Sequence, residues 1–420
     1  MDPGWLRLAG LTLFALGFGM ATNTLDPALL SYKSALLAPD HRNTALGLTT
    51  AAGLLVATFT QPFIGALSDR TRSRWGRRVP FFILGTLLSI ASLFAVALAP
   101  SLVLLALAFM AYEFASNTAL APWQALLPDQ VAPTRRGAAS GLKTMFEILA
   151  FVAGRRTAGY LIADDQILAS VTIAALVFGL SMFLTGLAAR EGRASNPAGE
   201  IGSQPPHPPG AVAVKTAWPP GFGWWFLNRG LFWGGLIALS SFVLFYLEDV
   251  VGMSFAEASR FFGDLSLVLG LSLLAVALPA GRLSDRIGRR PLILASCLIA
   301  ILGNAVLLTA RSRPTLILGG GLLGLAAGTY LASNWALATD LVPRSQAARY
   351  LGIANIATAG GSFLARFAGG ALIDPINRTF ESSSAGYFTL YGLTLIGFLL
   401  ATLAVLRMPR AAFYTAQPIE

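Results

Sequence analysis

The sequence has few charged residues. Lysine, arginine, aspartate and glutamate make up 12% of its 420 residues, whereas an ordinary soluble domain has about 25%. Hydrophobic residues account for 55% of the chain. Apolar runs of about 20 residues recur along it, and each is long enough to cross roughly 30 Å of hydrocarbon. This composition argues against a soluble protein and predicts an all-α polytopic membrane protein.

Metal-binding and nucleophilic residue types are also scarce. Cys297 is the single cysteine, and His41 and His207 are the only two histidines. The chain therefore has no disulfide framework and no cysteine- or histidine-based metal site. No glycine-rich turn is followed by Lys-Ser or Lys-Thr, which argues against an ATP-driven pump. We expect no enzymatic activity, no cofactor and no metal.

The apolar runs predict twelve membrane-spanning helices. They cover residues 5–35, 44–67, 79–99, 102–128, 138–163, 167–189, 223–248, 255–283, 291–310, 314–340, 346–373 and 385–407. Twenty of the thirty basic residues fall on the side of the two termini and six on the opposite side. The positive-inside rule therefore predicts cytoplasmic termini in an inner membrane. It also accounts for the net charge of +10 without nucleic acid, and we expect a monomer in the lipid bilayer.

One connection between the predicted helices is long. Residues 190–221, "REGRASNPAGEIGSQPPHPPGAVAVKTAWPPG", contain seven prolines and cannot form a helix interior. We interpret this stretch as an extended cytoplasmic tether. It predicts three units: a six-helix bundle over 1–189, the linker over 190–221 and a second six-helix bundle over 222–420.

The two halves repeat each other. The stretch "GALSDR" (65–70) reappears as "GRLSDR" (281–286), and "SNTALA" (116–121) as "SNWALA" (333–338). A third match has a constant offset of 211 residues and pairs Gly141 with Gly352, Arg155 with Arg366 and Gly159 with Gly370. Both halves begin on the same side, so we predict parallel repeats related by an axis along the membrane normal.

The first repeated stretch opens a basic loop after the second helix of each half. Its arginines are expected to pair with carboxylates that end neighbouring helices, which would latch the two bundles on the cytoplasmic side with about 1 kcal/mol for each exposed pair. The alternative is a charge cluster that only sets topology. The predicted gate residues are Gly65, Asp69, Arg70, Arg77, Arg78, Asp129, Asp285, Arg286, Arg289, Arg290 and Asp340.

The duplicated loop resembles the hallmark motif of the major facilitator superfamily. The resemblance implies a two-bundle carrier with a central cavity that opens to alternate sides, whose loop Asp and Arg control the inner gate. "SDRTRSRWGRRVPF" (68–81) and "ALAPWQALLPD" (119–129) are similar to the glycoside–pentoside–hexuronide and sucrose-type carriers. Melibiose-type sodium symporters of that branch have an aspartate two residues before the proline. Leu120 stands at that position here, which argues against sodium coupling of that kind.

Charged residues inside spanning helices are candidates for function. Glu113 and Glu147 must each be paired or protonated, so each is a candidate for proton coupling or for a static ion pair. Arg155 and Arg366 do not deprotonate, and they can hold one of these glutamates, a substrate group or the partner bundle as an outer gate. Asp26 precedes Pro27, where we expect a kink, and it either caps the break or lines the cavity.

Other polar and aromatic residues in the predicted helices are expected mainly to stabilise the structure. We expect Asn117, Asn334 and Asn355 to form hydrogen bonds between helices, and Arg260 and Asp264 to form an ion pair along one helix. Glu257 completes a predicted capping box with Ser254. Three aromatic residues could stack on a sugar ring or simply pack: Tyr112, Trp123 and Trp335.

These residues together predict a secondary active transporter that works by alternating access. It would move a small polar solute, such as a sugar or glycoside, with protons. One alternative is a proton-driven exporter of drugs or lipophilic compounds, which a mainly apolar cavity would favour. The other is a membrane factor that handles pigment or assembles a complex without transport.

Overall fold

The computed structural model describes residues 3–71, 73, 77–189, 220–341 and 347–409, and this part consists of helices and short turns without a β-strand. The first half contains α1 (Pro3–Thr12), α2 (Phe14–Thr24), η1 (Leu25–Leu29), α3 (Leu30–Leu37), η2 (Pro39–His41), α4 (Arg42–Arg70), α5 (Val79–Leu98), α6 (Leu102–Gln130), η3 (Pro133–Arg135), α7 (Arg136–Ala163) and α8 (Ile167–Ala188). The second half contains α9 (Phe222–Ser241), α10 (Val243–Asp249), α11 (Phe255–Ile287), α12 (Arg289–Thr309), α13 (Arg313–Leu341), α14 (Ala347–Thr379) and α15 (Ala385–Arg407).

The described helices form twelve spans, as the sequence predicted. Ten are long and apolar enough to cross a membrane, if α1 to α3 are counted as the single span Gly4–Leu37. A further span consists of α9 and α10, which are bent by 51° at their junction. The twelfth is α7, which is less apolar because it contains Lys143, Glu147, Arg155 and Arg156. The end of α14 differs from the prediction, because the helix continues through Pro375 to Thr379.

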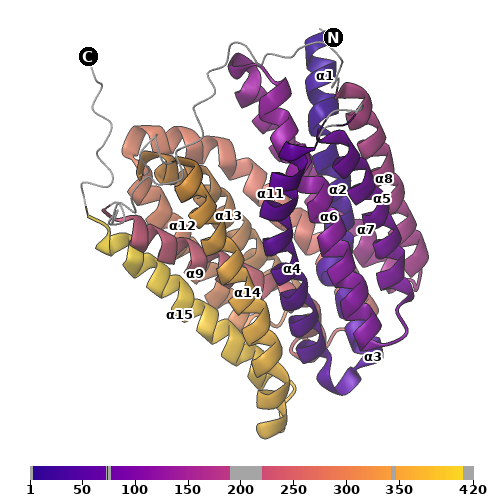
Figure 1. Ribbon diagram of the computed structural model, residues 1–420. Coiled ribbons are helices and arrows are strands. Elements are labelled where there is room, and N and C mark those ends of the chain that lie inside the picture. Colours follow the sequence, from indigo (N-terminus) through magenta and orange to yellow (C-terminus); the bar gives the residue numbers. More distant parts are fainter. Residues whose placement is uncertain (1–2, 72, 74–76, 190–219, 342–346, 410–420) are drawn as a thin grey trace, which may run out of the picture.

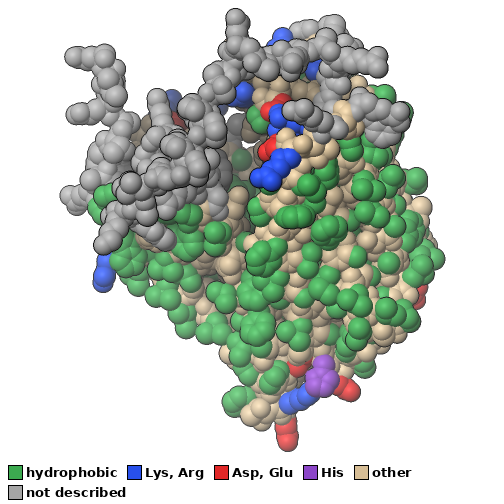
Figure 2. Space-filling model, viewed as in Figure 1, with side chains coloured by type: hydrophobic (Ala, Val, Ile, Leu, Met, Phe, Trp, Pro, Cys, Tyr) green, Lys and Arg blue, Asp and Glu red, His purple; other side chains and the backbone are tan. Residues whose placement is uncertain are grey.

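The helices are arranged in two bundles (Figure 1). α1 to α8 pack mainly on one another, and α9 to α15 do the same. The bundles meet where α7 packs on α11 and where α4 packs on α14. In the space-filling view, hydrophobic and uncharged atoms cover the flank, and most charged side chains lie toward the two ends (Figure 2). The predicted tether lies outside the described residues up to residue 219, so the domain boundaries stay a prediction.

The first span is broken at Asp26. Its backbone angles are φ −113° and ψ 119°, which are extended rather than helical. The residue before a proline is excluded from the helical region by the proline ring, and Pro27 follows directly. The predicted kink is therefore confirmed, and it turns the Asp26 side chain out of the regular helical series.

Glycines allow the two bundles to approach closely at both crossings. A Cβ on Gly159 of α7 would lie 2.3 Å from the carbonyl oxygen of Ser259 on α11. A Cβ on Gly47 of α4 would lie 2.5 Å from the Cα of Gly370 on α14. Gly159 and Gly370 are equivalent in the sequence repeat. Gly47 and Gly263 share the 216-residue offset of the basic loops, and a Cβ on Gly263 would approach Arg156 Cα at 3.1 Å. The two crossings therefore obey the same two-fold relation as the sequence.

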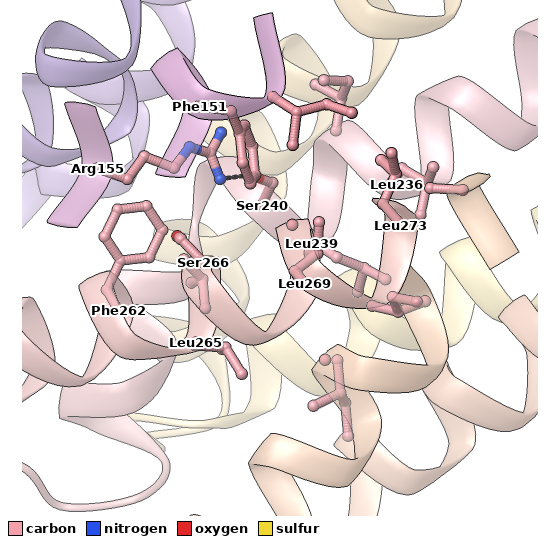
Figure 3. Close-up of a pocket in the computed structure, with 18 of the residues that line it drawn as sticks. Phe151, Arg155, Leu236, Leu239, Ser240, Phe262, Leu265, Ser266, Leu269 and Leu273 are labelled. Carbon is pink, nitrogen blue, oxygen red and sulfur yellow. Dashed lines mark hydrogen bonds between the residues drawn. The ribbon is translucent and has the colours of Figure 1, made fainter. Parts of the chain in front are cut away.

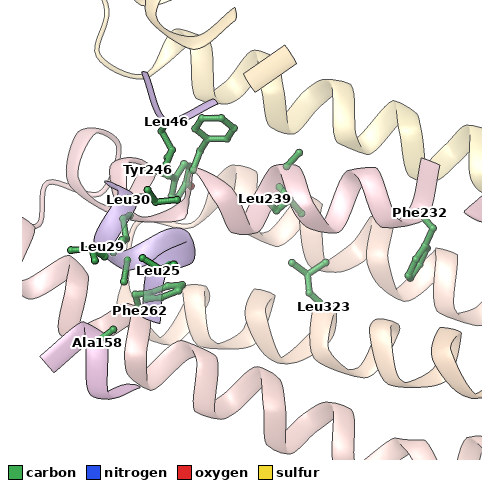
Figure 4. Close-up of a cluster of buried hydrophobic side chains, with 14 of the residues drawn as sticks. Leu25, Leu29, Leu30, Leu46, Ala158, Phe232, Leu239, Tyr246, Phe262 and Leu323 are labelled. Atoms are coloured by element: carbon green, nitrogen blue, oxygen red, sulfur yellow. The ribbon is translucent and has the colours of Figure 1, made fainter. Parts of the chain in front are cut away.

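A single cluster of buried apolar side chains spans both bundles (Figure 4). Leu25 and Ala158 from the first bundle belong to it, together with Phe262 and Tyr246 from the second. These buried side chains pack closely where the bundles cross, as side chains do in other protein interiors. The bundles are therefore held together by packing as well as by polar bonds.

The end of the bundles where α1 begins and α4 and α8 end is here called the terminus side, and the opposite end the far side. Hydrogen bonds and ion pairs that join described residues of the two bundles all lie in the far half. Examples are those between Arg42 and Glu248, between Thr44 and Asp374, and between Arg156 and Asp264. The far side is therefore closed.

Replacing Gly47 with alanine tests the crossing of α4 and α14. The added Cβ meets backbone rather than a flexible side chain, so we expect overpacking to cost about 1–3 kcal/mol and to lower the melting temperature in detergent. The control is Gly186→Ala on α8, where the Cβ would meet nothing within 4 Å. Gly186→Ala should leave the melting temperature unchanged or raise it, because alanine is more favourable than glycine in a helix by about 1 kcal/mol. Equal melting temperatures for the two variants would contradict the close crossing.

Candidate functional site

The basic loop of the first bundle is held by its own bundle. Arg77 and Arg78 each approach Asp129 at 2.9 Å, and Arg78 lies 3.5 Å from Asp69. These residues belong to α4, α6 and the turn before α5. The ion pairs therefore form without the second bundle, and they form while the far side is closed. This corrects the expectation that such pairs require the two bundles to meet on the terminus side.

The second copy of the loop behaves similarly. Arg289 pairs with Asp285 at 2.6 Å within one turn, and Arg290 donates to the backbone carbonyl of Leu406 at 2.9 Å. Arg70 and Arg286 are exposed, and Gly65 faces open space. The side chain of Asp340 lies outside the described part of the chain. The role of these residues as an inner gate stays a prediction.

The predicted charges of the interior do come together in part. Arg366 of α14 forms an ion pair with Asp26 at 2.5 Å, which joins the second bundle to the break in the first span. The two side chains are 14% and 16% exposed, so the pair is largely shielded from solvent. Asp26 Oδ1 and Arg366 Nε have no hydrogen-bond partner among the described residues. The pair is therefore joined by one contact and can separate when the bundles move.

Glu113 lies beside this pair but is not part of an ion pair in the described structure. Its Oε2 accepts a hydrogen bond from Asn117 Nδ2 at 3.1 Å, and Asn117 Oδ1 accepts one from Gln61 Nε2 at 2.9 Å. The amide chain joins α4 to α6, which confirms the expected interhelical bond of Asn117. A carboxyl group bonded to a neutral amide, rather than to an arginine, is free to gain or lose a proton without breaking an ion pair.

Arg155 has a different environment from its repeat partner. Its guanidinium donates to Asn23 Oδ1 and Ser240 Oγ, both at 3.1 Å, and lies 4.2 Å from the ring centre of Phe151 and 5.3 Å from that of Phe262 (Figure 3). No carboxylate of the described chain forms an ion pair with it. Of the alternatives given for Arg155, a pair with Glu113 or Glu147 is not formed among the described residues, and the hydrogen bond to Ser240 joins it to the partner bundle.

Two other candidates lie away from this centre. Glu147 is paired with Lys143, one turn earlier on α7, at 2.7 Å, and about half of its side chain is exposed. The Asn355 side chain is exposed and makes no hydrogen bond in the described structure, so the expected interhelical bond is absent. Asn334 does accept one, from Arg229 at 2.7 Å. The sequence analysis missed Arg229, although an arginine within the predicted span 223–248 was a sufficient signal.

The aromatic candidates are not available for stacking on a solute. Tyr112 is 1% exposed and shares a hydrogen bond with Thr22 at 3.0 Å. Trp123 is 2% exposed and donates to the carbonyl of Leu11 at 2.9 Å. Both therefore pack inside the first bundle. The side chain of Trp335 lies outside the described part.

Ion pairs between the bundles replace the pair predicted along α11. Asp264 accepts from Arg156 at 2.6 Å and from Tyr160 at 3.1 Å, both on α7. Arg260 pairs with Asp164 at the end of α7 instead of with Asp264. The prediction failed because the spacing of Arg260 and Asp264 permits a pair along the helix, while the close crossing offers each a partner on the other bundle.

The far side contains a second polar network that the sequence analysis missed. Asp374 is 7% exposed, and its carboxylate accepts from Asn43 Nδ2 at 2.8 Å and from the Thr44 backbone N–H at 2.7 Å and hydroxyl at 2.8 Å. Arg42 contacts both Glu248 and Asp249, and the Tyr387 hydroxyl donates to Asp249 at 2.6 Å. These residues lie at helix ends, where sequence alone does not tell which ends meet.

A cavity of about 330 Å³ lies between α7 of the first bundle and α9, α11 and α13 of the second (Figure 3). Arg155 and Phe262 lie on one side of it, and Leu236 and Leu273 lie on the other (Figure 3). Its walls are mainly leucine side chains, including Leu236, Leu265, Leu269, Leu273 and Leu323. The sequence analysis did not foresee a mainly apolar cavity whose lining includes an arginine.

Comparisons with known proteins agree on the class of protein. A relative from Bacillus subtilis (strain 168), "Minor myo-inositol transporter IolF", is 31% identical over 86 residues, 20% of each chain. Another from Aspergillus oryzae, "MFS efflux transporter aclA", is 39% identical over 94 residues, 22% of this chain and 17% of the relative. The matched stretch thus spans only about a fifth of these relatives, and it does not single out the sucrose-type branch.

Solved structures match over nearly the whole length. A bacterial homologue of the human lysosomal transporter Spinster has a TM-score of 0.74 at 17% identity and covers 99% of this chain and 100% of its own. A D-xylose–proton symporter has a TM-score of 0.70 at 15% identity, with 97% and 98% covered. Identities this low establish the fold alone. The family model of the Major Facilitator Superfamily matches residues 8–277 and 258–416. With its twelve spans, two bundles and repeated halves, the chain belongs to the Major Facilitator Superfamily of membrane transporters.

Proposed function

We propose that the protein is a secondary active transporter that works by alternating access, in a state closed on the far side. The distribution of bonds between the bundles supports this. They are concentrated in the far half, whereas the loop arginines Arg77, Arg78 and Arg289 bond within their own bundles at the terminus side. One chain supplies both bundles, so the proposed cycle needs no second copy.

We further propose that the terminus side is cytoplasmic and that the membrane is an inner membrane. The support is the excess of basic residues on that side, which the positive-inside rule assigns to the cytoplasm. The state closed on the far side is then open to the cytoplasm. Asp374, Asn43 and Thr44 form the outer lock in this proposal, and the basic loops close the inner side in the opposite state.

The solute that the cavity favours is an amphiphilic or lipophilic small molecule. Its leucine walls offer few hydrogen-bond partners, and burying hydroxyl groups without partners costs a sugar binding free energy. Its volume is in the range of pockets for drug-sized ligands. A small polar solute is the second candidate, supported by the amide chain of Gln61, Asn117 and Glu113 at the centre.

We assign proton coupling to Glu113. It is a carboxyl inside the first bundle that forms no ion pair with a described residue, and it lies next to Asp26 and Arg366, whose pair joins the two bundles. Proton binding at Glu113 changes the charge beside that pair. The coupling between proton binding and bundle movement then follows from electrostatics, without a direct bond between Glu113 and the solute.

Glu113→Gln tests this assignment. We expect transport driven by an imposed pH gradient in proteoliposomes to fall by about tenfold, within the usual range of coupling between sites, while exchange of solute across the membrane without a gradient continues. The matched control is Glu381→Gln, because Glu381 is exposed after the end of α14 and does not line the cavity. If Glu113→Gln kept full gradient-driven transport, the assignment would be wrong.

Asp374→Asn tests the outer lock. A neutral amide loses the charge-assisted bonds to the start of α4, each of which contributes about 1.5–3 kcal/mol. We expect the far side to open more often, so that a cysteine introduced at Leu46 on a background without Cys297 reacts with a maleimide roughly tenfold faster.

The control for the outer lock is Asp165→Asn. Asp165 also lies on the far side, but it contacts Tyr32 of its own bundle. Its variant should label like the parent protein. Unchanged labelling in Asp374→Asn would exclude the lock, and it would favour the alternative of an assembly factor that need not open.

A further inference from the structure

The cavity between α7 and the second bundle is lined by an arginine, Arg155, that forms no ion pair with a described residue. Arg155 carries its positive charge at all accessible pH values, and its contacts are an amide oxygen, a hydroxyl and two aromatic rings. The other interior arginine of the repeat, Arg366, is paired with Asp26. A buried cation without a paired anion is costly, so the part of the cavity beside Arg155 attracts an acidic group from outside the protein.

Further polar groups at the cavity also lack partners. The Nε1–H of Trp233 is buried and has no hydrogen-bond acceptor among the described residues. The hydroxyl of Ser266, whose residue is 3% exposed, makes no side-chain hydrogen bond in the described structure. Both residues line the same cavity as Arg155. Unpaired donors of this kind are rare inside proteins unless a ligand or water satisfies them.

Most of the remaining wall is complementary to an apolar body, and Glu147, which also lines the cavity, is paired with Lys143. Leu269 and Leu273 of α11, Leu323 of α13 and Leu236 of α9 all line the cavity. Arg155 lies beside Phe151 on one side of the cavity, and Leu236 and Leu273 lie on the other (Figure 3). A ligand that fits this arrangement has its charge at one end and its apolar part along the rest of its length.

We propose that this cavity binds a small amphipathic organic anion, with its acidic group on the guanidinium of Arg155 and its apolar body against α11 and α13. The proposal rests on the proposed transport function and names the class of solute. A planar guanidinium binds a carboxylate with two parallel hydrogen bonds. The site therefore selects an acid over a neutral analogue of the same shape.

Binding of two matched probes to the purified full chain tests the proposal. Naphthalene-1-acetate and its neutral amide, naphthalene-1-acetamide, share the same ring and differ in charge. Titration calorimetry should give a dissociation constant about tenfold lower for the carboxylate, as expected for hydrogen bonds to a charged group. In Arg155→Gln this preference should vanish, while the amide binds within about twofold of its original affinity.

Two further variants keep the result interpretable. Leu269→Trp fills the apolar part of the cavity and should weaken both probes, although Arg155 is intact. Arg313→Gln removes an exposed arginine near Glu257, outside the cavity, and should leave both affinities unchanged. A melting curve for each variant shows whether it is folded.

Equal affinity of the parent protein for the two probes would overturn the proposal, as would failure of the carboxylate to bind. A preference that survives in Arg155→Gln would do the same. The transport function is tested separately, by uptake into proteoliposomes. Uptake of the neutral amide without any preference for the acid would overturn the anion site alone. Binding of the acid through Arg155 without uptake of either probe would support the site and contradict transport.

Discussion

The closed far side depends on a helix cap that one bundle provides to the other. The first backbone N–H groups of any helix lack partners within it, and α4 has no side-chain cap of its own at His41. Asp374 of α14 supplies the missing acceptor to Thr44, and its negative charge also suits the positive end of the helix dipole. The equivalent helix of the second half, α11, needs no such help, because Ser254 and Glu257 form a capping box at its start. Opening the far side therefore exposes an unsatisfied helix end in one bundle and an unpaired carboxylate in the other.

The two helix crossings between the bundles explain how charges are distributed inside the molecule. Glycines bring α7 onto α11 and α4 onto α14, and the arginines one turn away from them, Arg155 and Arg366, are thereby brought to the boundary between the bundles. The residues that contact these two arginines do not follow the two-fold relation. Arg366 meets Asp26, which the break before Pro27 turns toward it, whereas Arg155 meets neutral groups and an apolar cavity. A symmetric scaffold thus produces one paired and one unpaired arginine, and the proposed ligand site follows from that difference.

Movement of the bundles would affect these contacts unequally. The bonds of the basic loops, such as Arg78 with Asp129, lie within one bundle and would persist during rocking. The bonds of Arg366 with Asp26, Arg156 with Asp264 and Thr44 with Asp374 join the bundles and would have to break. The polar bonds that have to break are therefore concentrated in a few residues of the far half, and one of them, between Arg366 and Asp26, lies beside Glu113.

The sequence by itself determined the number of spans, their approximate bounds, the repeat and the kink at Pro27. Each of these follows from local patterns: apolar length, equal spacing of matched residues and the steric restriction before a proline. It also identified Asp26, Glu113, Asn117, Arg155 and Arg366 as interior polar residues, because a charge in an apolar run is visible without a structure. Only the tertiary structure decided their partners, as the failed pairing of Arg260 with Asp264 illustrates. The cap at Asp374 and the cavity at Arg155 likewise depend on which helix faces cross, and that is set by packing between residues more than a hundred positions apart.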